Sequence, residues 1–229
     1  MLREIVLDTE TTGFEPDEGH KLVEIGCVEL INHLPTGNVF HVYINPLRDV
    51  PADASRVHGL TDEFLKDKPI FSEIVSDFIE FVGSDTMIIH NAPFDMKFLN
   101  AELKASGMKT LPMKQVIDTL LLAREKFPGQ PANLDALCRR FKVDNTERKF
   151  HGALLDSELL AEVYLELIGG RQHGLGLGSE LAEKQSKALN ANIKRQQRTP
   201  RSFPVSEAEL KAHDEFLVKI KNPIWNEEK

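Results

Sequence analysis

The spacing of apolar and polar residues predicts that the chain opens with three β-strands. Branched apolar side chains fill residues 3–8 and 38–45, and residues 21–31 alternate between apolar and polar side chains. Pro46 ends the third strand, because proline has no N–H to donate to a neighbouring strand. The connections between these segments are short, so we expect the three strands to pair in antiparallel fashion.

Further along the chain, helical and extended patterns alternate. Residues 71–82 repeat apolar side chains at helical spacing, and short strands are predicted at 86–90 and 116–118. Further helices are predicted over residues 94–106, 119–126, 133–141 and 152–168. Three strands followed by alternating helices and strands predict an α/β fold, with a mixed five-stranded sheet and flanking helices.

Composition divides the chain into three parts. Residues 1–170 contain the predicted elements of one compact domain. Residues 171–202 are rich in glycine, polar and basic residues, which is typical of a flexible linker. Residues 203–229 regain apolar side chains but are too few to build a core alone. We therefore expect this last segment to dock, either on the domain or on a partner.

Charge and hydropathy restrict the class of protein. The net charge of −8 argues against a protein that coats duplex DNA through a broad basic face. It is compatible with an enzyme that holds one strand end, since bound cations supply local positive charge. Cys27 and Cys138 stand in apolar contexts and are expected to be reduced core thiols. Without a long apolar run or a secretory signal, we expect a cytoplasmic protein with no membrane partner.

Two carboxylates mark the end of the first strand. Asp8 and Glu10 are two residues apart, so their side chains leave the same face of the sheet. Neighbouring anions repel each other unless a cation joins them, and Mg²⁺ and Mn²⁺ prefer oxygen ligands of this kind. An ordinary acidic turn after a strand explains the pair equally well, so these two residues alone leave both interpretations open.

Three more residues are candidates for the same site. Asp95 falls in the first turn of a predicted helix, where an acid is also favoured simply by the helix dipole. Asp156 shares a helical face with Leu160 and Val163, an unusual place for a carboxylate without a partner. His151 precedes Asp156 by five residues, about 140° around a helix. We therefore expect His151 on a loop before the helix, a placement that suits a general base.

Three ordered segments, DTETTG, HNAPFD and HGALLD, together resemble the exonuclease motifs of the DEDDh superfamily of 3′→5′ exonucleases. More narrowly, EGHKLVEIG, FHVYINP, VHGLTDEFL and VIDTLLLAR are similar to segments of the proofreading subunits of bacterial DNA polymerase III. The resemblance covers about residues 3–170. It implies a ribonuclease H-like fold, in agreement with the predicted mixed sheet.

The resemblance also implies an activity and a set of site residues. Two divalent cations, Mg²⁺ or Mn²⁺, are expected on four carboxylates: Asp8, Glu10, Asp95 and Asp156. His151 is expected to be the general base for the attacking water. The implied substrate is the 3′ end of single-stranded DNA, which loses its mismatched terminal nucleotide as a 5′-mononucleotide. Contacts with this substrate are implied for Asp8, Thr9, Glu10, Thr11, Asp53, His58 and Asp156, with Asp53 standing where the family pattern has a glutamate.

The C-terminal part carries a second resemblance. Residues 172–177 resemble the QxxLxL/F pattern by which bacterial replication proteins bind the sliding clamp, with Gln172, Leu175 and Leu177 as the expected contacts. So short a motif also matches by chance. The apolar segment 203–229 is then expected to bind the catalytic (alpha) subunit of the polymerase. The sequence leaves open whether a small accessory subunit binds the domain.

Two other hypotheses compete with DNA proofreading. An RNA-trimming exonuclease of the same superfamily would have nearly the same site, but it would have little use for a clamp motif and a docking segment. A non-catalytic scaffold would keep the fold without the chemistry. The intact set of four acids and His151 argues against that scaffold.

Overall fold

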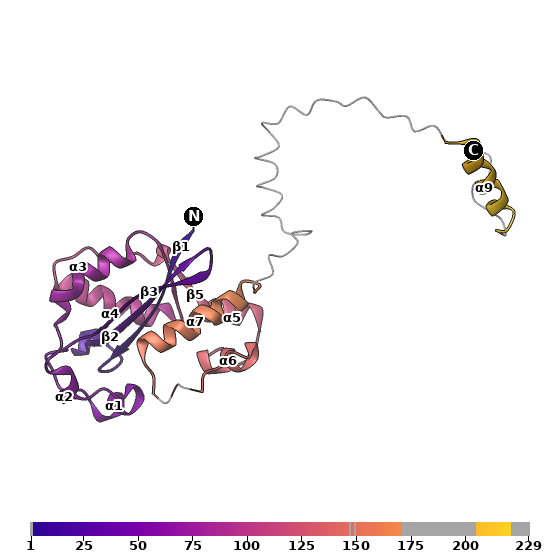
Figure 1. Ribbon diagram of the computed structural model, residues 1–229. Helices are drawn as coiled ribbons and strands as arrows, with labels where there is room; N and C mark the ends of the chain where they lie inside the picture. Colours follow the sequence, from indigo (N-terminus) through magenta and orange to yellow (C-terminus); the bar gives the residue numbers. More distant parts are fainter. Residues whose placement is uncertain (1, 147, 149, 171–204, 221–229) are drawn as a thin grey trace. The chain divides into compact units, whose positions relative to one another are not determined.

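The computed structural model (Figure 1) describes residues 2–146, 148, 150–170 and 205–220. The chain divides into two units, residues 1–175 and 176–229, and each is described by itself. Among the described residues, no helix is long and apolar enough to cross a membrane. Residues 172–177, with the expected clamp contacts, lie outside the described residues.

A mixed five-stranded sheet in the order β3-β2-β1-β4-β5 forms the centre of the first unit. β1 (Arg3–Thr11) pairs antiparallel with β2 (Leu22–Ile31) and parallel with β4 (Thr86–Ile89). β3 (Leu34–Tyr43) extends the sheet beyond β2, and β5 (Val116–Asp118) extends it beyond β4. The predicted mixed five-stranded sheet with flanking helices is confirmed.

The β2–β3 hairpin is tighter than the sequence suggested. The third strand was predicted to start at residue 38, but β3 starts at Leu34, directly after a turn at Asn32 and His33. Both turn residues have positive φ, 51° and 67°, a conformation that suits a two-residue hairpin. The predicted antiparallel pairing of β2 and β3 is confirmed. Histidine is not a usual residue for this turn, which explains why the early start of β3 was missed.

The helices of the first unit flank the sheet, some packing directly on it and others on a neighbouring helix (Figure 1). They are α1 (Ala52–His58), α2 (Asp62–Leu65), α3 (Phe71–Val82), α4 (Ala92–Ala105), α5 (Thr119–Lys126), α6 (Leu134–Phe141) and α7 (Ala153–Leu167). The predicted helices from residue 71 onward are all present. α1 and α2 lie where no element was predicted, because both are too short to show a helical repeat.

Alternate residues of β1 face different helices. Ile5 and Leu7 belong to the core formed with α3 and α4, whereas Val6 packs with Leu160 and Tyr164 of α7. The even-numbered side chains of β1 therefore face α7. Asp8 and Glu10 follow in the same phase, so the strand carries both carboxylates to the α7 side of the sheet.

A glycine allows α7 to approach the sheet closely at this point. Gly26 of β2 pairs in register with Asp8, and a Cβ on Gly26 would lie 2.3 Å from the carbonyl carbon of Ala153. The hydroxyl of Ser157 donates to the Gly26 carbonyl oxygen over 2.9 Å. The first turn of α7 is thereby held beside Asp8, and Asp156 belongs to that turn.

In the second unit, the structure describes one helix, α9 (Glu207–Leu217). Ser206 caps it: the Ser206 hydroxyl accepts from the Glu209 N–H, and the Glu209 carboxylate accepts from the Ser206 N–H. Leu210 and Phe216 are large apolar side chains that remain exposed on this helix. The other apolar residues expected near both ends of the segment, at 203 and 225, lie outside the described residues.

Candidate active site

Four carboxylates meet near the carboxyl ends of β1 and β4. Asp8 and Glu10 come from β1, Asp95 from the first turn of α4, which follows β4, and Asp156 from the first turn of α7. Asp95 and Asp156 are each 3% exposed, which confirms that Asp156 leans into the structure. The structure therefore brings the four acids from three separate sequence segments to one end of the sheet.

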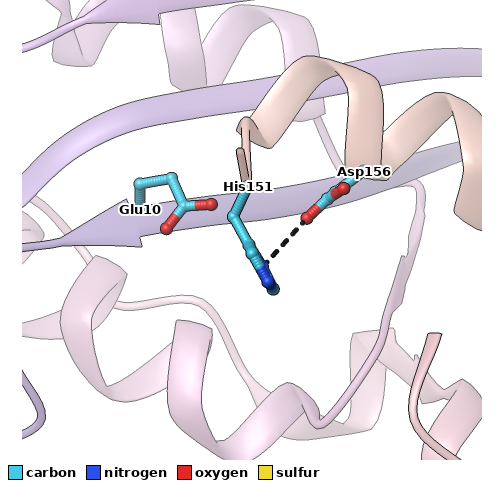
Figure 2. A group of neighbouring side chains, drawn as sticks. All are labelled: Glu10, His151 and Asp156. Atoms are coloured by element: carbon cyan, nitrogen blue, oxygen red, sulfur yellow. Dashed lines mark ion pairs between the residues drawn. The ribbon is translucent and has the colours of Figure 1, made fainter. Parts of the chain in front are cut away.

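His151 completes this group from the loop before α7, as its spacing from Asp156 predicted. Figure 2 shows Glu10 on β1, Asp156 on α7 and His151 just before that helix, with their side chains converging. One ligand atom from each of the three residues lies within 4.8 Å of the other two. The His151 side chain is 49% exposed, and its backbone N–H donates to the Val57 carbonyl oxygen over 3.0 Å. The loop is thus tied to the end of α1.

Asp95 is held in place by polar contacts around the start of α4. The Thr9 hydroxyl donates to Asp95 Oδ1 over 2.7 Å. α4 begins after Asn91, whose φ is 65°, and the Asn91 N–H donates to Asp118 Oδ1 over 3.1 Å. Asparagine tolerates this left-handed conformation better than most residues. Asp118, at the end of β5, therefore fixes the turn from which Asp95 projects.

The clustering of acids makes their ionisation unfavourable. Burial, followed by the charge of Asp156, raises the pKa of Glu10 to about 8. Burial also raises the pKa of Asp95 to about 7. The pKa of Asp8 lies well above its usual range because of burial and the charges of Asp95 and Glu10. A divalent cation would remove this repulsion, and four carboxylates are the hard oxygen donors that Mg²⁺ and Mn²⁺ bind.

Asp156 differs from the other three acids. Burial alone would raise its pKa, but contacts with His151 and Arg148 outweigh burial and hold the pKa below the usual value. Arg148 donates to both carboxylate oxygens, over 2.5 Å and 2.6 Å. Asp156 is therefore the one acid of the four that already has a positively charged partner among the described residues.

A pocket of about 500 Å³ opens beside Glu10. Phe14, Phe94, Val57 and His58 contribute to its wall. Phe14 is 76% exposed, so its ring is accessible to a ligand in this pocket. An apolar wall next to a cluster of acids is suited to a ligand that joins a flat apolar ring to a phosphate, the latter held through cations.

Two of the expected substrate residues are engaged within the protein. The Thr9 hydroxyl donates to Asp95, and the Thr11 hydroxyl donates to the Gly13 carbonyl oxygen over 2.6 Å. Their hydroxyl protons are therefore used. What Thr9 and Thr11 retain for a ligand are the oxygen lone pairs and the backbone.

Two more of the expected substrate residues, His58 and Asp53, lie on the pocket wall. His58 is buried at the end of α1, and burial lowers its pKa, so the ring is neutral near neutral pH. Its Nδ1 accepts from the Leu60 N–H over 3.0 Å, which leaves the proton on Nε2. That Nε2 is buried beside the Thr11 backbone, which opposes the lowering of the pKa, and it makes no hydrogen bond of standard geometry to any residue that the structure describes. Asp53 is exposed and pairs with Arg56.

Comparison with known proteins agrees with this geometry. The exonuclease family model RNase_T matches residues 5–164. The DNA polymerase III subunit epsilon of Rickettsia felis is 54% identical over 223 residues, covering 96% of this chain and 97% of that protein. This chain belongs to the exonuclease family and, within it, to the DNA polymerase III epsilon subunits.

Solved exonuclease structures share the fold of this epsilon-family chain. Exonuclease X in complex with 5′ overhanging duplex DNA is 25% identical, with a TM-score of 0.58 over 72% of this chain and 90% of that one. The nuclease domain of 3′hExo, a DEDDh family member bound to rAMP, is 19% identical, with a TM-score of 0.62 over 72% of this chain and 91% of that one.

Two residues near the acids were missed by the sequence analysis of this epsilon-family chain. Arg148 contacts Asp156, and the buried Glu24 of β2 pairs in register with Glu10. Glu24 accepts a hydrogen bond from His41 or shares a proton with it, with 2.7 Å between His41 Nε2 and Glu24 Oε1. The register of β1 and β2 could have identified Glu24. Nothing in the sequence around Arg148 indicates that a loop side chain turns inward.

Proposed function

We propose that this chain is the proofreading 3′→5′ exonuclease of a bacterial DNA polymerase III, removing terminal mismatched nucleotides of DNA as 5′-mononucleotides. The observation that carries the proposal is the cluster of four acids with His151 beside a partly apolar pocket. That cluster sits in a chain similar over nearly its whole length to a DNA polymerase III epsilon subunit. Such an enzyme would act in the cytoplasm, on the 3′ end of single-stranded DNA.

Asp8, Glu10, Asp95 and Asp156 would hold two divalent cations, Mg²⁺ or Mn²⁺. When bound, the cations would supply positive charge at the attacking and leaving oxygens of the phosphodiester. The raised pKa values of Asp8, Glu10 and Asp95 support this assignment. Burial raises all three, and repulsion between the carboxylates adds to it for Asp8 and Glu10, so bound cations would favour the ionised acids.

His151 would accept the proton of the attacking water. Its side chain is half exposed and lies beside Glu10 and Asp156, so water can reach it. Histidine is the side chain that most often acts as a general base in enzymes. A rotation of the half-exposed His151 side chain would let the ring approach the phosphodiester of a bound strand.

The pocket beside Glu10 would receive the terminal nucleotide. Phe14 and Phe94 offer apolar ring surfaces on which a base can stack, a contact that tolerates any base. His58 forms part of the pocket wall, and Thr11 offers oxygen lone pairs. Asp53 pairs with Arg56 through Oδ1 alone and its side chain is 87% exposed, so it would remain accessible to the strand. Tolerance of all four bases is what a proofreading enzyme needs.

The second unit would join the nuclease to the replication machinery. We assign polymerase binding, through its catalytic alpha subunit, to residues 203–229, because α9 exposes Leu210 and Phe216. Residues 172–177 would bind the sliding clamp, with Gln172, Leu175 and Leu177 as contacts. A small accessory subunit is an additional candidate partner for the first unit.

The test is release of mononucleotides from a primer with a mismatched 3′ end. The full chain should release them with Mg²⁺ or Mn²⁺ and not with EDTA. Asp8→Ala should abolish release while the circular dichroism spectrum stays native, and Asp17→Ala, an exposed acid outside the site, should leave release unchanged. A fully active Asp8→Ala protein, or release that survives EDTA, would overturn the proposal.

A further inference from the structure

Arg148 occupies the centre of the candidate site, although the proposed reaction assigns it no task. Its side chain is 8% exposed. Nε and Nη2 donate hydrogen bonds to the two carboxylate oxygens of Asp156, over 2.5 Å and 2.6 Å. Nη1 donates to Asp135 Oδ1 of α6 over 2.6 Å. An arginine side chain that is this buried, and whose three nitrogen atoms all donate hydrogen bonds, is fixed in position rather than free on the surface.

Arg148 also contacts His151. Its Nη2 lies 2.8 Å from His151 Nδ1. Nδ1 also lies 3.5 Å from Asp156 Oδ2, the contact drawn in Figure 2, so the ring nitrogen faces both groups. A guanidinium carries only N–H donors, so in its hydrogen bond with Arg148 Nδ1 is the acceptor and cannot also donate to Asp156. A neutral imidazole has a single acceptor nitrogen, and here it is occupied. His151 therefore has no free lone pair with which to take a proton from water while Arg148 stays in this position.

A divalent cation needs the atoms that Arg148 holds. A cation on Asp156 must bind at least one of the two carboxylate oxygens, and both now accept from the guanidinium. Two positive charges close to one carboxylate repel each other. Binding of the cation and the present contact of Arg148 with Asp156 are thus mutually opposed.

Asp135 offers Arg148 a place to remain after it leaves Asp156. This carboxylate belongs to the first turn of α6 and is 42% exposed, and it also accepts from the Asn145 side-chain amide over 3.2 Å. It lies on the opposite side of the guanidinium from the atoms that bind Asp156, because it bonds to Nη1. Arg148 can therefore swing away from Asp156 without losing every partner.

We propose that Arg148 is an internal competitor of the catalytic cation: without metal it occupies Asp156 and the acceptor nitrogen of His151, and cation binding releases both. This inference rests on the proposed function to the extent that Asp156 is a metal ligand and His151 the general base. It adds that loading of the metal site and exposure of the base are one event, with Arg148 as the positioning residue that couples them.

The experiment measures Mn²⁺ binding to the full chain without DNA, by the electron paramagnetic resonance signal of free Mn²⁺. Arg148→Met keeps an unbranched side chain but removes every donor. We expect its Kd for Mn²⁺ to fall by about tenfold or more, the scale of charged hydrogen bonds. Arg148→Lys keeps the positive charge but cannot donate to both oxygens of Asp156 in the same geometry. Its Kd for Mn²⁺ should therefore fall by a smaller factor than that of Arg148→Met.

The matched control is Arg139→Met, which removes the same charge from the exposed face of α6 and should leave the Kd unchanged. An unchanged or higher Kd in Arg148→Met would overturn the proposal. If Arg148→Met fails to fold by circular dichroism, Arg148→Lys decides: a lower Kd supports the competition, and an unchanged Kd refutes it. A wild-type chain that binds Mn²⁺ but releases no nucleotide from DNA would refute the proposed function and leave the Arg148 result standing.

Discussion

At the scale of single residues, the site is a concentration of acids that lacks matching positive charge. Asp8, Glu10 and Asp95 all have raised pKa values, and Arg148 neutralises Asp156 alone. The sequence identified the acids through their motifs and spacing. It could not identify Arg148, because the inward turn of a long loop side chain depends on how the loop lies against α6 and α7, which local sequence does not specify.

Removing the metal should make stability depend on pH in a definite direction. The pKa of Glu10 is raised from 4.5 to about 8 and that of Asp95 from 3.8 to about 7. The folded state therefore binds more protons than the unfolded state between these values, and stability falls as pH rises. In EDTA, we expect the free energy of unfolding, measured with urea, to decrease from about pH 5 to pH 8.

Glu10→Gln should flatten that decrease, because a neutral amide loses no proton. Mg²⁺ added at the upper end of the range should restore stability to the wild type, since ionised carboxylates bind metal. A wild-type stability that rises steadily over this range in EDTA would contradict the assigned pKa shifts.

His151 should matter for the chemical step rather than for binding. His151→Ala is expected to lower kcat by about 10²–10⁴, the usual contribution of a general base, with little change in KM for the DNA strand. Steady-state kinetics on a mismatched primer at saturating Mg²⁺ measures both. His213→Ala, in α9, serves as the control and should keep full kcat. A His151→Ala protein with unchanged kcat would remove His151 from the reaction.

At the scale of elements, strand phase and one close approach bring the acids together. The alternation of β1 predicted that Asp8 and Glu10 share a face, and it also sets Val6 against α7. The positions of the long helices were predictable because their apolar repeats are clear. The short α1 and α2, and the turn at 32–33, were missed because local sequence gives them little signal.

Gly26 should be a required glycine. In Gly26→Ala the new methyl group meets the backbone of α7 at 2.3 Å, so the first turn of the helix must move. We expect a loss of about 1–3 kcal/mol in stability, measured by urea unfolding, and a larger loss of nuclease activity because Asp156 moves with that turn. Gly152→Ala, whose methyl group would meet no atom within 4 Å, should have a far smaller effect. Equal behaviour of the two variants would contradict this packing argument.

At the scale of the whole molecule, the first unit would cleave DNA and the second would bind other replication proteins. Residues 5–164 match the exonuclease family, so the family match ends before the second unit begins. α9 has a well-formed N-terminal cap but exposes Leu210 and Phe216. A helix that keeps its apolar side chains exposed is suited to binding a partner.

The double variant Leu210→Ser, Phe216→Ser should therefore weaken binding to the polymerase catalytic subunit by about tenfold or more, because two apolar side chains are lost from the interface. Nuclease activity on free DNA should stay at the wild-type level. Surface plasmon resonance with the immobilised polymerase subunit measures the binding, and the primer assay measures the nuclease activity. Lys211→Ser on the same helix is the control. Unchanged binding of the double variant would exclude these two side chains as the docking contact.

The most direct test of the central claim is the direction and product of cleavage on one DNA strand labelled in turn at each end. With Mg²⁺, a 3′-terminal label should leave first, as a 5′-mononucleotide, while a 5′-labelled strand shortens by single nucleotides, and EDTA should stop both. Release from the 5′ end, internal cuts, or cleavage that persists in EDTA would contradict the account.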